Sequence, residues 1–493
     1  MRVENASDHS HHDLWAAIGK PCVRRGLMSV DANVDVAVRR PAYIPMMGGA
    51  DPIIGHVRVL RRGRTEMQLR LAREHIDVTR FKVALGLEPV WVTSPALAHE
   101  VLGTKAASFV KAFGLAVFLR PLLGDGLLTS ERETHAKHRK LLAPALAHRR
   151  IASYGDLMGE RAARTVAAWK DGETLDASEA IMRLTLEIVG KTLFDSEVGG
   201  DADVVGEALT EVMERVIGQL SSFVPVPPQV PTPSNLRMRA AIKRLDAVVY
   251  RLVRERKASG EDRGDLLGML LASRYEDGTP MSDRQIRDEA MTMILAGHET
   301  TANALAWCLY LLARHPDVRE RLEAEVDALG KDAPSAADLE RLPLCLAVLK
   351  EAMRLYPPAY MVARRATDDV DLVDRSGDEP RVYAIKKGNV VLVNVMGIHR
   401  REDLYPEPDR FDPDRFLDKG AAHEHTRCAY LSFGAGPRVC IGNHFALMEG
   451  QILLAAITRA ARLELTSDAP VVPEPLVTLR PKGGLRVRVH RRC

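Results

Sequence analysis

The chain has 493 residues, and its 69 Lys and Arg nearly balance its 66 Asp and Glu, for a formal net charge of +3. This balance argues against a nucleic-acid binder or an acidic-surface protein. The six cysteines form no CxxC pair, which argues against a disulfide framework or a structural zinc site and favours a reducing compartment. The length alone suggests about three domains, although one dominant core is expected.

The N-terminal segment, residues 1–40, begins with the polar stretch MRVENASDHSHHDLWAAIGK. It lacks the apolar run of a signal peptide or of a membrane-spanning helix. The sequence therefore predicts a soluble, cytoplasmic protein without a transmembrane anchor, in which residues 1–40 are a flexible N-terminal extension.

A small β part frames a chain that is otherwise helical in pattern. Residues 77–95 alternate apolar and polar side chains around Gly86, as expected for a hairpin, and strand patterns return at NVVLVNV and GGLRVRVH. The predicted class is mainly α with a small β region. Residues 221–235 carry five prolines and predict a stiff connection, either a plain linker or a cover over the mouth of a binding site.

A long helix is predicted after Ser282, which forms a capping-box pattern with Gln285. No proline interrupts the pattern before Pro316, so the helix should span roughly 50 Å. Its middle, EAMTMILAGHETTANALAWCLYLLA, is apolar on nearly all sides and should run through the core.

Polar residues interrupt the middle of this helix, and buried polar groups need partners. They are His298, Glu299, Thr300, Thr301 and Asn303. One interpretation is structural: the threonine hydroxyls donate hydrogen bonds to backbone carbonyls of the same helix, and Glu299 forms an ion pair with a basic residue. A zinc-protease motif is excluded because Ala302 stands where the second histidine belongs. The small Ala296 and Gly297 favour a flat ligand or a diatomic molecule against the helix.

Cys440 lies among glycines 434, 436 and 442, just before a helix predicted to start near Asn443. A lone buried cysteine is usually an inert apolar residue, but a helix N-terminus favours the thiolate. One thiolate alone under-coordinates a metal, so the other ligands would come from a macrocycle. Its carboxylates would pair with basic side chains, although each of these taken singly fits a solvated charge. The candidates are Arg438, Arg364, His135 and Arg139.

Four motifs together resemble the cytochrome P450 family of haem-thiolate monooxygenases. FGAGPRVCIG, Phe433 to Gly442, matches the haem-ligand motif, and AGHETT, Ala296 to Thr301, is similar to the oxygen-activation motif. Glu351 and Arg354 match the Glu-x-x-Arg pair, and Arg415 of FDPDRF completes that triad. The resemblance implies the cytochrome P450 fold, with the long central helix over the haem, and a single haem domain at residues 41–493.

The resemblance also implies the roles of individual residues. Cys440 is the ligand of the iron of haem b (iron protoporphyrin IX), and Thr300 and Glu299 are catalytic, supplying protons for the activation of O2. Other residues implied to contact the cofactor are Phe433, Ala296, Gly297, Arg438, Arg364, His135 and Arg139. His135 stands where many members have tryptophan, and Arg364 is preferred to Arg365 by its spacing from Arg354.

The implied reaction inserts one oxygen atom from O2 into an apolar, lipid-like substrate: a fatty acid, a terpenoid or a steroid. We expect no flavin or nicotinamide domain after the haem domain. NAD(P)H electrons are therefore expected through a separate ferredoxin or flavodoxin type donor with its reductase, and the protein is expected to be a monomer that binds no nucleic acid. The alternatives are a peroxide-using or rearranging haem-thiolate enzyme, a non-catalytic haem sensor or carrier, and a structural helical protein.

The substrate-pocket candidates follow from regions that line the substrate site in the family. They are Phe113, Val117, Ala359, Tyr360, Val362 and Val477, and the hydroxyls of Tyr360 and Thr478 are possible polar handles. Ordinary core packing explains the same apolar residues equally well.

Overall fold

The computed structural model describes residues 41–52, 54–83, 87–195, 202–220, 226–261, 263–417 and 426–492, without the side chains at 61–62, 113–116, 202–203, 217 and 220. The predicted extension, residues 1–40, and Gly86 lie outside the described residues. Residues 42–493 form one compact unit.

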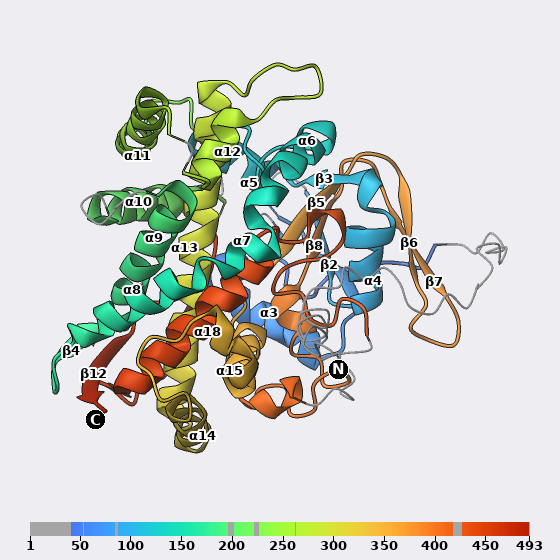
Figure 1. The fold of residues 1–493 in the computed structure, drawn as a ribbon. Coiled ribbons are helices and arrows are strands. Elements are labelled where there is room, and N and C mark those ends of the chain that lie inside the picture. The colour runs from blue at the N-terminus through green and yellow to red at the C-terminus, as the bar shows by residue number, and fades with distance from the viewer. Residues whose placement is uncertain are drawn as a thin grey trace, which may run out of the picture. The chain divides into compact units, whose positions relative to one another are not determined.

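Helices dominate the described part of the chain (Figure 1). The earlier ones are α2 (Val57–Arg62), α3 (Arg64–Arg73), α4 (Pro95–His99), α5 (Phe113–Leu123), α6 (Arg132–Leu142), α7 (His148–Ala152), α8 (Gly155–Ala167), α9 (Ala177–Phe194), α10 (Ala202–Leu220), α11 (Pro233–Ser259) and α12 (Leu266–Ala272). The later ones are α13 (Asp283–Arg314), α14 (Pro316–Asp327), α15 (Pro343–Leu355), α16 (Val395–Ile398) and α18 (Asn443–Ala460). The mainly helical class predicted from the sequence is confirmed.

Helix α13 is the predicted central helix. The Ser282 hydroxyl oxygen accepts a hydrogen bond from the backbone N–H of Gln285 at 3.2 Å, which caps the helix as the sequence indicates. The helix has 32 residues, and α9, α11, α15 and α18 all contact it. It is therefore surrounded by other helices, which explains why its middle is apolar on nearly every side.

The main sheet has the strand order β1-β2-β8-β5-β3. Its strands are β1 (Val78–Arg80), β2 (Val90–Val92), β3 (Phe109–Lys111), β5 (Val362–Ala366) and β8 (Val390–Val393). The antiparallel pairing of Val78 with Val92 confirms the hairpin predicted for residues 77–95. The edge strand β3 was not predicted, because three residues are too few to show an alternating pattern.

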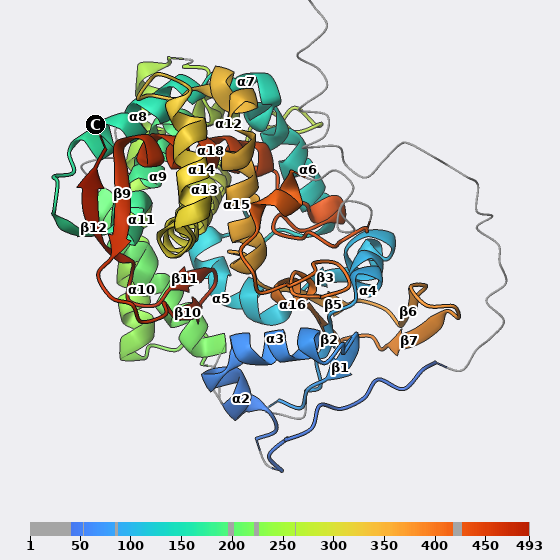
Figure 2. The ribbon, with the colours of Figure 1, turned by 90° about the horizontal axis from the view of Figure 1, so that it is seen from below.

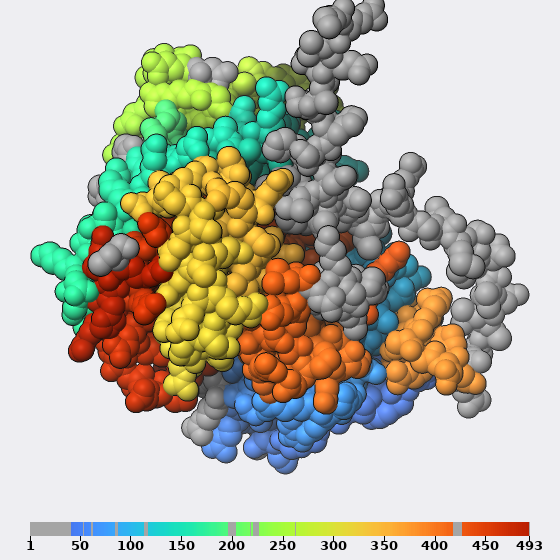
Figure 3. Space-filling view, turned by 60° about the horizontal axis from the view of Figure 1, so that its bottom comes forward, coloured from blue at the N-terminus to red at the C-terminus, as the bar shows by residue number. Residues whose placement is uncertain are grey.

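Three smaller sheets complete the β part. Strands β4 (Thr174–Asp176), β12 (Arg486–Arg491) and β9 (Ala461–Leu465) form one, β6 (Val370–Asp374) pairs with β7 (Arg381–Ile385), and β10 (Pro473–Pro475) pairs with β11 (Leu479–Pro481). Figure 2 shows β9 and β12 side by side, well apart from β1 and β2. The Arg321 guanidinium of α14 binds Asp414 at 2.6 Å, and Figure 3 shows α14, in yellow, on the same face as the orange segment that contains Asp414.

The proline-rich connection is shorter than predicted. Helix α11 begins at Pro233, with the Thr232 hydroxyl oxygen accepting the backbone N–H of Asn235 at 3.2 Å. Proline is compatible with the first turn of a helix, because that position needs no donor. The last three residues of the predicted connection, 233–235, are therefore helical, while its first five, 221–225, lie outside the described residues.

Candidate functional site

The segment that carries Cys440 is a tight loop held against the rest of the protein. The Cys440 backbone N–H donates to the Phe433 carbonyl at 2.9 Å, and Gly434 and Gly436 have φ angles of +70° and +68°. A Cβ on Gly436 would lie 1.8 Å from the Leu102 carbonyl oxygen. Glycine is therefore required at 436 by both conformation and space. Gly442 has a negative φ of −93° and no described protein atom within 4 Å of its Cβ direction.

Helix α18 begins directly after this loop, as predicted, and one of its first N–H groups contacts the cysteine. The Gly442 N–H donates to the Cys440 sulfur, and this bond and the charge of Arg139 lower the pKa of the thiol. Burial has the largest effect and raises the pKa, although part of the residue is exposed. Among protein groups alone, the expected thiolate is thus not favoured, and a cation at the sulfur would be needed to stabilise it.

Arg139 holds the cysteine loop from the side of α6. Its Nη1 donates to the Val439 carbonyl oxygen at 2.8 Å, directly before Cys440 in the chain. One turn earlier in α6, His135 is buried. The structure therefore brings His135, Arg139 and Cys440 into one neighbourhood, as the sequence predicts.

A cluster of basic side chains lies beside the loop. Lys111 of β3 stands directly opposite Arg364 of β5, an arrangement that is unfavourable for two like charges. The Arg438 Nη1 donates to the Ser130 carbonyl oxygen at 2.9 Å, and its Nη2 binds Glu131. The Lys111 Nζ donates to the same Ser130 oxygen at 2.7 Å. We call Lys111, His135, Arg139, Arg364 and Arg438 the basic cluster.

Mutual repulsion is visible in the pKa values of the basic cluster. Burial and then Arg438 lower the pKa of Lys111 to about 7 and that of Arg364 to about 10. Burial, Arg438 and Lys111 lower the pKa of His135 to about 3. Glu131 is the one carboxylate that raises the values of Lys111 and Arg364. Five basic groups around one carboxylate fit a cofactor that carries further carboxylates, such as the two propionates of haem.

Exposure distinguishes Arg364 from Arg365 as the candidate for binding a carboxylate of the cofactor. Arg365 is exposed, whereas Arg364 is partly buried and interacts with Arg438. Sequence reasoning missed Lys111 and Glu131, which belong to short segments without a motif. The signal that could have found Lys111 is its place opposite Arg364, which appears only once the register of β3 is known.

The threonines of α13 adopt the structural arrangement considered above. The Thr300 Oγ1 donates to the Ala296 carbonyl at 2.8 Å, and the Thr301 Oγ1 donates to the Gly297 carbonyl at 3.3 Å. Glu299 has no direct ion pair among the described residues; its Oε1 accepts a hydrogen bond from the Thr478 Oγ1 at 2.6 Å. Burial raises the pKa of Glu299, and Thr478 and the charge of Arg480 lower it.

Ala296 and Gly297 face different surroundings. Ala296 is exposed although it lies in the middle of the central helix, so open space adjoins α13 at this point. A Cβ on Gly297 would lie 3.0 Å from the Val189 Cγ2 of α9. The small size of Gly297 therefore serves the packing of α13 against α9, and its contact with a cofactor stays a prediction.

The other polar residues of α13 have the partners that burial requires. The His298 Nδ1 lies 2.6 Å from the Ile294 carbonyl oxygen, and the Asn303 Nδ2 donates to the Thr478 Oγ1 at 3.1 Å. Thr301 interacts with Glu449 of α18, which is fully buried. Burial raises the pKa of Glu449 to about 8 and Thr301 lowers it, but neither carboxyl oxygen has a well-aligned hydrogen bond among the described residues.

Glu351, Arg354 and Arg415 come together below this helix. The Arg354 Nε and Nη2 bind the two Glu351 oxygens at 2.6 and 2.8 Å, and both side chains are fully buried. Arg354 also donates to the carbonyls of His399 and Pro408 at 2.8 and 2.7 Å. The Arg415 Nε lies 3.6 Å from the Glu351 Oε1. The one-turn spacing thus forms a buried, bidentate pair rather than an exposed one.

The substrate-pocket candidates are spread over three segments. Val117 of α5, Val362 of β5 and Val477 are partly buried, and Ala359 is exposed. The side chain of Phe113 lies outside the described residues.

The two predicted polar handles, Tyr360 and Thr478, are engaged in hydrogen bonds within the protein, and their contact with a substrate stays a prediction. The Tyr360 hydroxyl donates to the Leu476 carbonyl at 2.7 Å and accepts from the Arg64 Nη1 at 3.2 Å. The Thr478 hydroxyl is likewise bonded to Glu299 and Asn303. Both hydroxyls serve internal contacts between segments that are distant in sequence, which is why the chain pattern gave no sign of their use.

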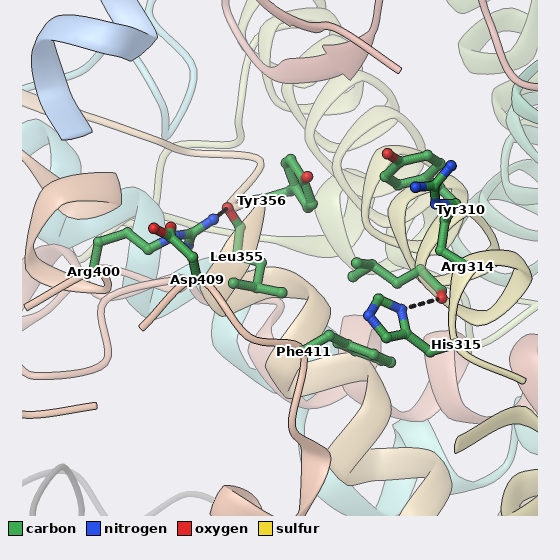
Figure 4. Close-up of a pocket in the computed structure, with 9 residues that line it drawn as sticks. Tyr310, Arg314, His315, Leu355, Tyr356, Arg400, Asp409 and Phe411 are labelled. Carbon is green, nitrogen blue, oxygen red and sulfur yellow. Dashed lines mark hydrogen bonds and ion pairs between the residues drawn. The ribbon is translucent and has the colours of Figure 1, made fainter. Parts of the chain in front are cut away.

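A cavity of about 260 Å³ lies at the C-terminal end of α13, lined by Tyr310, Tyr356 and Phe411 among others (Figure 4). Tyr310 is about 15 Å along the helix from Thr300 at the usual rise. The cavity therefore belongs to another part of the molecule than Cys440 and Thr300. Among the described helices, none is both long and apolar enough to cross a membrane.

Comparison with known proteins supports one family. A sequence model of the family described as Cytochrome P450 matches residues 45–487. The chain is 34% identical to cyclooctatin synthase of Streptomyces melanosporofaciens, over 89% of this chain and 94% of that protein. It is 33% identical to pentalenene oxygenase of Streptomyces avermitilis, over 90% and 96%. The solved structure of the cytochrome P450DA heme domain matches with a TM-score of 0.80 and 29% identity, over 92% of this chain and 99% of that one.

Proposed function

The chain belongs to the cytochrome P450 family and is a monooxygenase, and from this premise we propose that it oxidises an apolar terpenoid with electrons from a separate donor protein. The observation that carries the proposal is the basic cluster beside Cys440. Three arginines and Lys111 near one carboxylate supply positive charge for a dianionic cofactor, His135 is neutral near pH 7, and the sulfur is the ligand type of the family.

Haem would be held by residues from five segments of the chain: the cysteine loop, β3, β5, α6 and α13. Cys440 would bind the iron, and the basic cluster, with Lys111 added to the residues predicted from sequence, would bind the carboxylates. Phe433, Ala296 and Gly297 would contact the macrocycle. Bound haem supplies the redox chemistry by which dioxygen is split.

The protons for this chemistry would come from α13. Burial raises the pKa of Glu299, so its carboxyl group can hold and release a proton closer to neutral pH than a solvated glutamate. The Thr300 hydroxyl proton is directed at the Ala296 carbonyl, which leaves the oxygen lone pairs available as acceptors. Glu299 would thus store the proton, and Thr300 would pass it on by rotating its hydroxyl.

The terpenoid assignment is supported by two observations. The candidate lining residues Val117, Val362 and Val477 are apolar, which favours a hydrocarbon skeleton. The two Streptomyces relatives carry names that refer to the terpenoids cyclooctatin and pentalenene. A terpenoid is therefore preferred to a fatty acid or a steroid.

The electron donor would be a ferredoxin or flavodoxin with its NAD(P)H-dependent reductase, as is usual for bacterial relatives. The cytoplasmic location and the monomeric state expected from the sequence remain predictions. With dioxygen and NADPH but without a donor protein, the purified protein should consume no NADPH, and addition of ferredoxin and its reductase should start consumption.

The first experiment tests the cysteine. Cys440→Ala should abolish the carbon monoxide spectrum that reduced thiolate-ligated haem gives, because the alanine offers no sulfur. Cys308→Ala, which changes a buried cysteine elsewhere in the chain, is the control and should keep the spectrum. A Cys440→Ala protein with an unchanged spectrum would refute the ligand assignment.

The second experiment tests the substrate class. Purified protein is titrated with pentalenene, lauric acid and a steroid, and the shift of the haem absorption band is recorded for each. We expect saturable shifts with pentalenene at the lowest concentration. Saturation by lauric acid or the steroid at lower concentration would reject the terpenoid assignment without touching the cysteine.

A further inference from the structure

Thr478 is placed between two side chains of the central helix. It is buried and lies in the turn between β10 and β11. Its Oγ1 donates to the Glu299 Oε1 at 2.6 Å and accepts from the Asn303 Nδ2 at 3.1 Å. A hydroxyl has one proton to donate. Because Asn303 approaches with a donor, the Thr478 proton is directed at Glu299.

The helix makes three consecutive contacts with the β10–β11 hairpin. Glu299, Asn303 and Trp307 are spaced by one helical turn each, so they share one face of α13. Trp307 completes the row, because its Nε1 donates to the Leu479 carbonyl at 3.1 Å. The face of α13 that carries Glu299 is therefore bonded to the β10–β11 hairpin at three successive positions, twice at Thr478 and once at Leu479.

The turn is a fixed support rather than a mobile loop end. The Leu476 carbonyl accepts the Tyr360 hydroxyl at 2.7 Å, and the Leu479 N–H donates to the Pro358 carbonyl at 3.0 Å. Trp307 is itself held by stacking on Tyr356, with ring centroids 3.9 Å apart. Because the turn is already held in place, the Thr478 hydroxyl loses little conformational entropy when it forms a hydrogen bond.

We propose that Thr478, oriented by Asn303, is a positioning residue that fixes the carboxyl group of Glu299 on the turn next to Val477. The inference rests on the proposed function, in which Glu299 supplies protons and Val477 lines the substrate side. It means that one fixed turn carries both Val477 on the substrate side and the hydroxyl that holds the acid.

The charges around Glu299 are consistent with this role. Its pKa is raised by burial and lowered by Thr478 and by Arg480 of β11. Arg480 is already engaged, since its Nε binds Glu474 at 3.0 Å and its Nη2 lies 3.6 Å from Glu214 of α10. His298, the next residue in α13, has its pKa lowered to about 4 by burial and carries no charge near neutral pH. Thr478 therefore makes the only hydrogen bond to the Glu299 carboxyl group among the described residues.

The test compares Thr478→Val, which keeps the shape and removes the hydroxyl, with Thr478→Ser, which keeps the hydroxyl. The readout is the infrared band of the Glu299 carboxyl group in the haem-loaded protein, identified by subtracting the Glu299→Gln spectrum and followed against pH. Loss of a hydrogen bond to the charged form raises a pKa. We expect the titration midpoint to move to higher pH in Thr478→Val and to return in Thr478→Ser.

A second readout separates this inference from the proposed function. With ferredoxin, its reductase and pentalenene as the probe substrate, product formed per NADPH should fall about 100-fold in Glu299→Gln. It should fall about fivefold in Thr478→Val, which corresponds to one hydrogen bond. Unchanged product per NADPH in Glu299→Gln would reject Glu299 as the proton source and leave the infrared result valid.

The outcome that would overturn the inference is an unchanged midpoint in Thr478→Val together with a normal Glu299 band. Thr478→Ala, which is smaller and avoids overpacking the turn, replaces the valine variant if that protein does not fold. Asn303→Leu should move the midpoint in the same direction by less, because it frees the Thr478 hydroxyl to rotate without removing it.

Discussion

The Glu351 triad and the basic cluster are both groups of buried charge, and they are balanced in different ways. In the triad, Arg354 makes five hydrogen bonds, to Glu351 and to three backbone carbonyls. In the basic cluster, five basic groups surround the single carboxylate of Glu131. Arg354 therefore has all its hydrogen-bond partners within the chain, whereas the basic cluster has a surplus of positive charge.

The difference separates scaffold from site. A buried charge that is fully paired contributes to one fixed geometry, and removing a partner is costly because the remaining charge has nowhere to go. A surplus of one sign weakens the protein alone and strengthens the binding of an oppositely charged group. The following substitutions test this difference between scaffold and site.

The largest effect is expected from Glu351→Gln, which leaves Arg354 buried without its carboxylate. The free energy of unfolding should fall by about 3–5 kcal/mol, measured by chemical denaturation. Glu407→Gln, at the exposed pair with Arg410, is the control and should change stability by about 0.5 kcal/mol or less. Equal losses in the two variants would show that burial does not distinguish the pairs.

Glu449 is a buried carboxyl group whose pKa is shifted by burial and by Thr301 and by no cation among the described residues, so it tests a buried acid that lacks an opposite charge. Its pKa is raised from 4.5 to about 8, which means that the folded state keeps a proton that the unfolded state loses. The stability linked to this group is full below about pH 4.5, declines as pH rises to about 8 and is constant above that. Glu449→Gln should therefore raise the free energy of unfolding at pH 7 by about 3 kcal/mol.

The measurement for Glu449 is the free energy of unfolding between pH 4.5 and 8.5. The variant should lack the decline seen in the parent protein. Glu323→Gln is the contrasting control, because Glu323 is buried but binds Arg462 at 2.6 Å, and that change should destabilise the protein at pH 7. A parallel pH dependence in the parent and in Glu449→Gln would contradict the raised pKa.

Lys111→Met should relieve part of the repulsion in the basic cluster. The pKa of Lys111 is lowered from 10.5 to about 7, so the unfolded state binds more protons between these values. The stability of the cofactor-free protein should rise with pH across that window, and the variant should lose this rise. At pH 7 the cofactor-free variant should be about 2 kcal/mol more stable, with allowance for solvent screening.

In the haem-loaded form, the Lys111→Met substitution should weaken the protein's hold on haem, although it stabilises the cofactor-free protein. Without the Lys111 charge, haem should dissociate faster, as measured by transfer to apomyoglobin. If Lys111→Met retains haem as tightly as the parent protein, Lys111 does not belong to the carboxylate-binding group.

The smallest effect distinguishes two neighbouring arginines. Arg364→Gln should speed haem dissociation about tenfold, since a charged hydrogen bond contributes about 1.5 kcal/mol or more. Arg365→Gln, one residue on and exposed, is the matched control and should leave the rate unchanged. An effect confined to Arg365→Gln would reverse the assignment.

The sequence predicts those parts of the site whose members are close together in the chain. The glycines and Cys440 lie in one loop, and Glu351 and Arg354 lie one turn apart on a helix, so spacing alone brings them together. The long α13 follows from its cap at Ser282 and the absence of proline. These features depend on local geometry, which residue order determines directly.

The partners of these residues depend on contacts between distant segments. Thr478 meets Glu299 because a two-strand hairpin lies against α13, and Lys111 faces Arg364 because of one register in the main sheet. A shift of one residue in the pairing of β3 with β5 would turn Lys111 to the other face of the sheet, and a shift in the β10–β11 hairpin would move Thr478 in the same way. The pattern of a three-residue strand does not specify such a register, so Lys111 and the role of Thr478 could be found only from the structure.

The 3.0 Å approach of position 297 to the Val189 Cγ2 has an evolutionary consequence. The space between α9 and α13 is shared by the two positions, so a gain of volume at one is tolerated when the other loses volume. Lineages in which Gly297 became alanine should carry a smaller residue than valine at 189, and the two substitutions should have arisen close together in descent. The residues at positions 189 and 297 therefore set together the distance between α9 and the helix that carries Thr300 and Glu299.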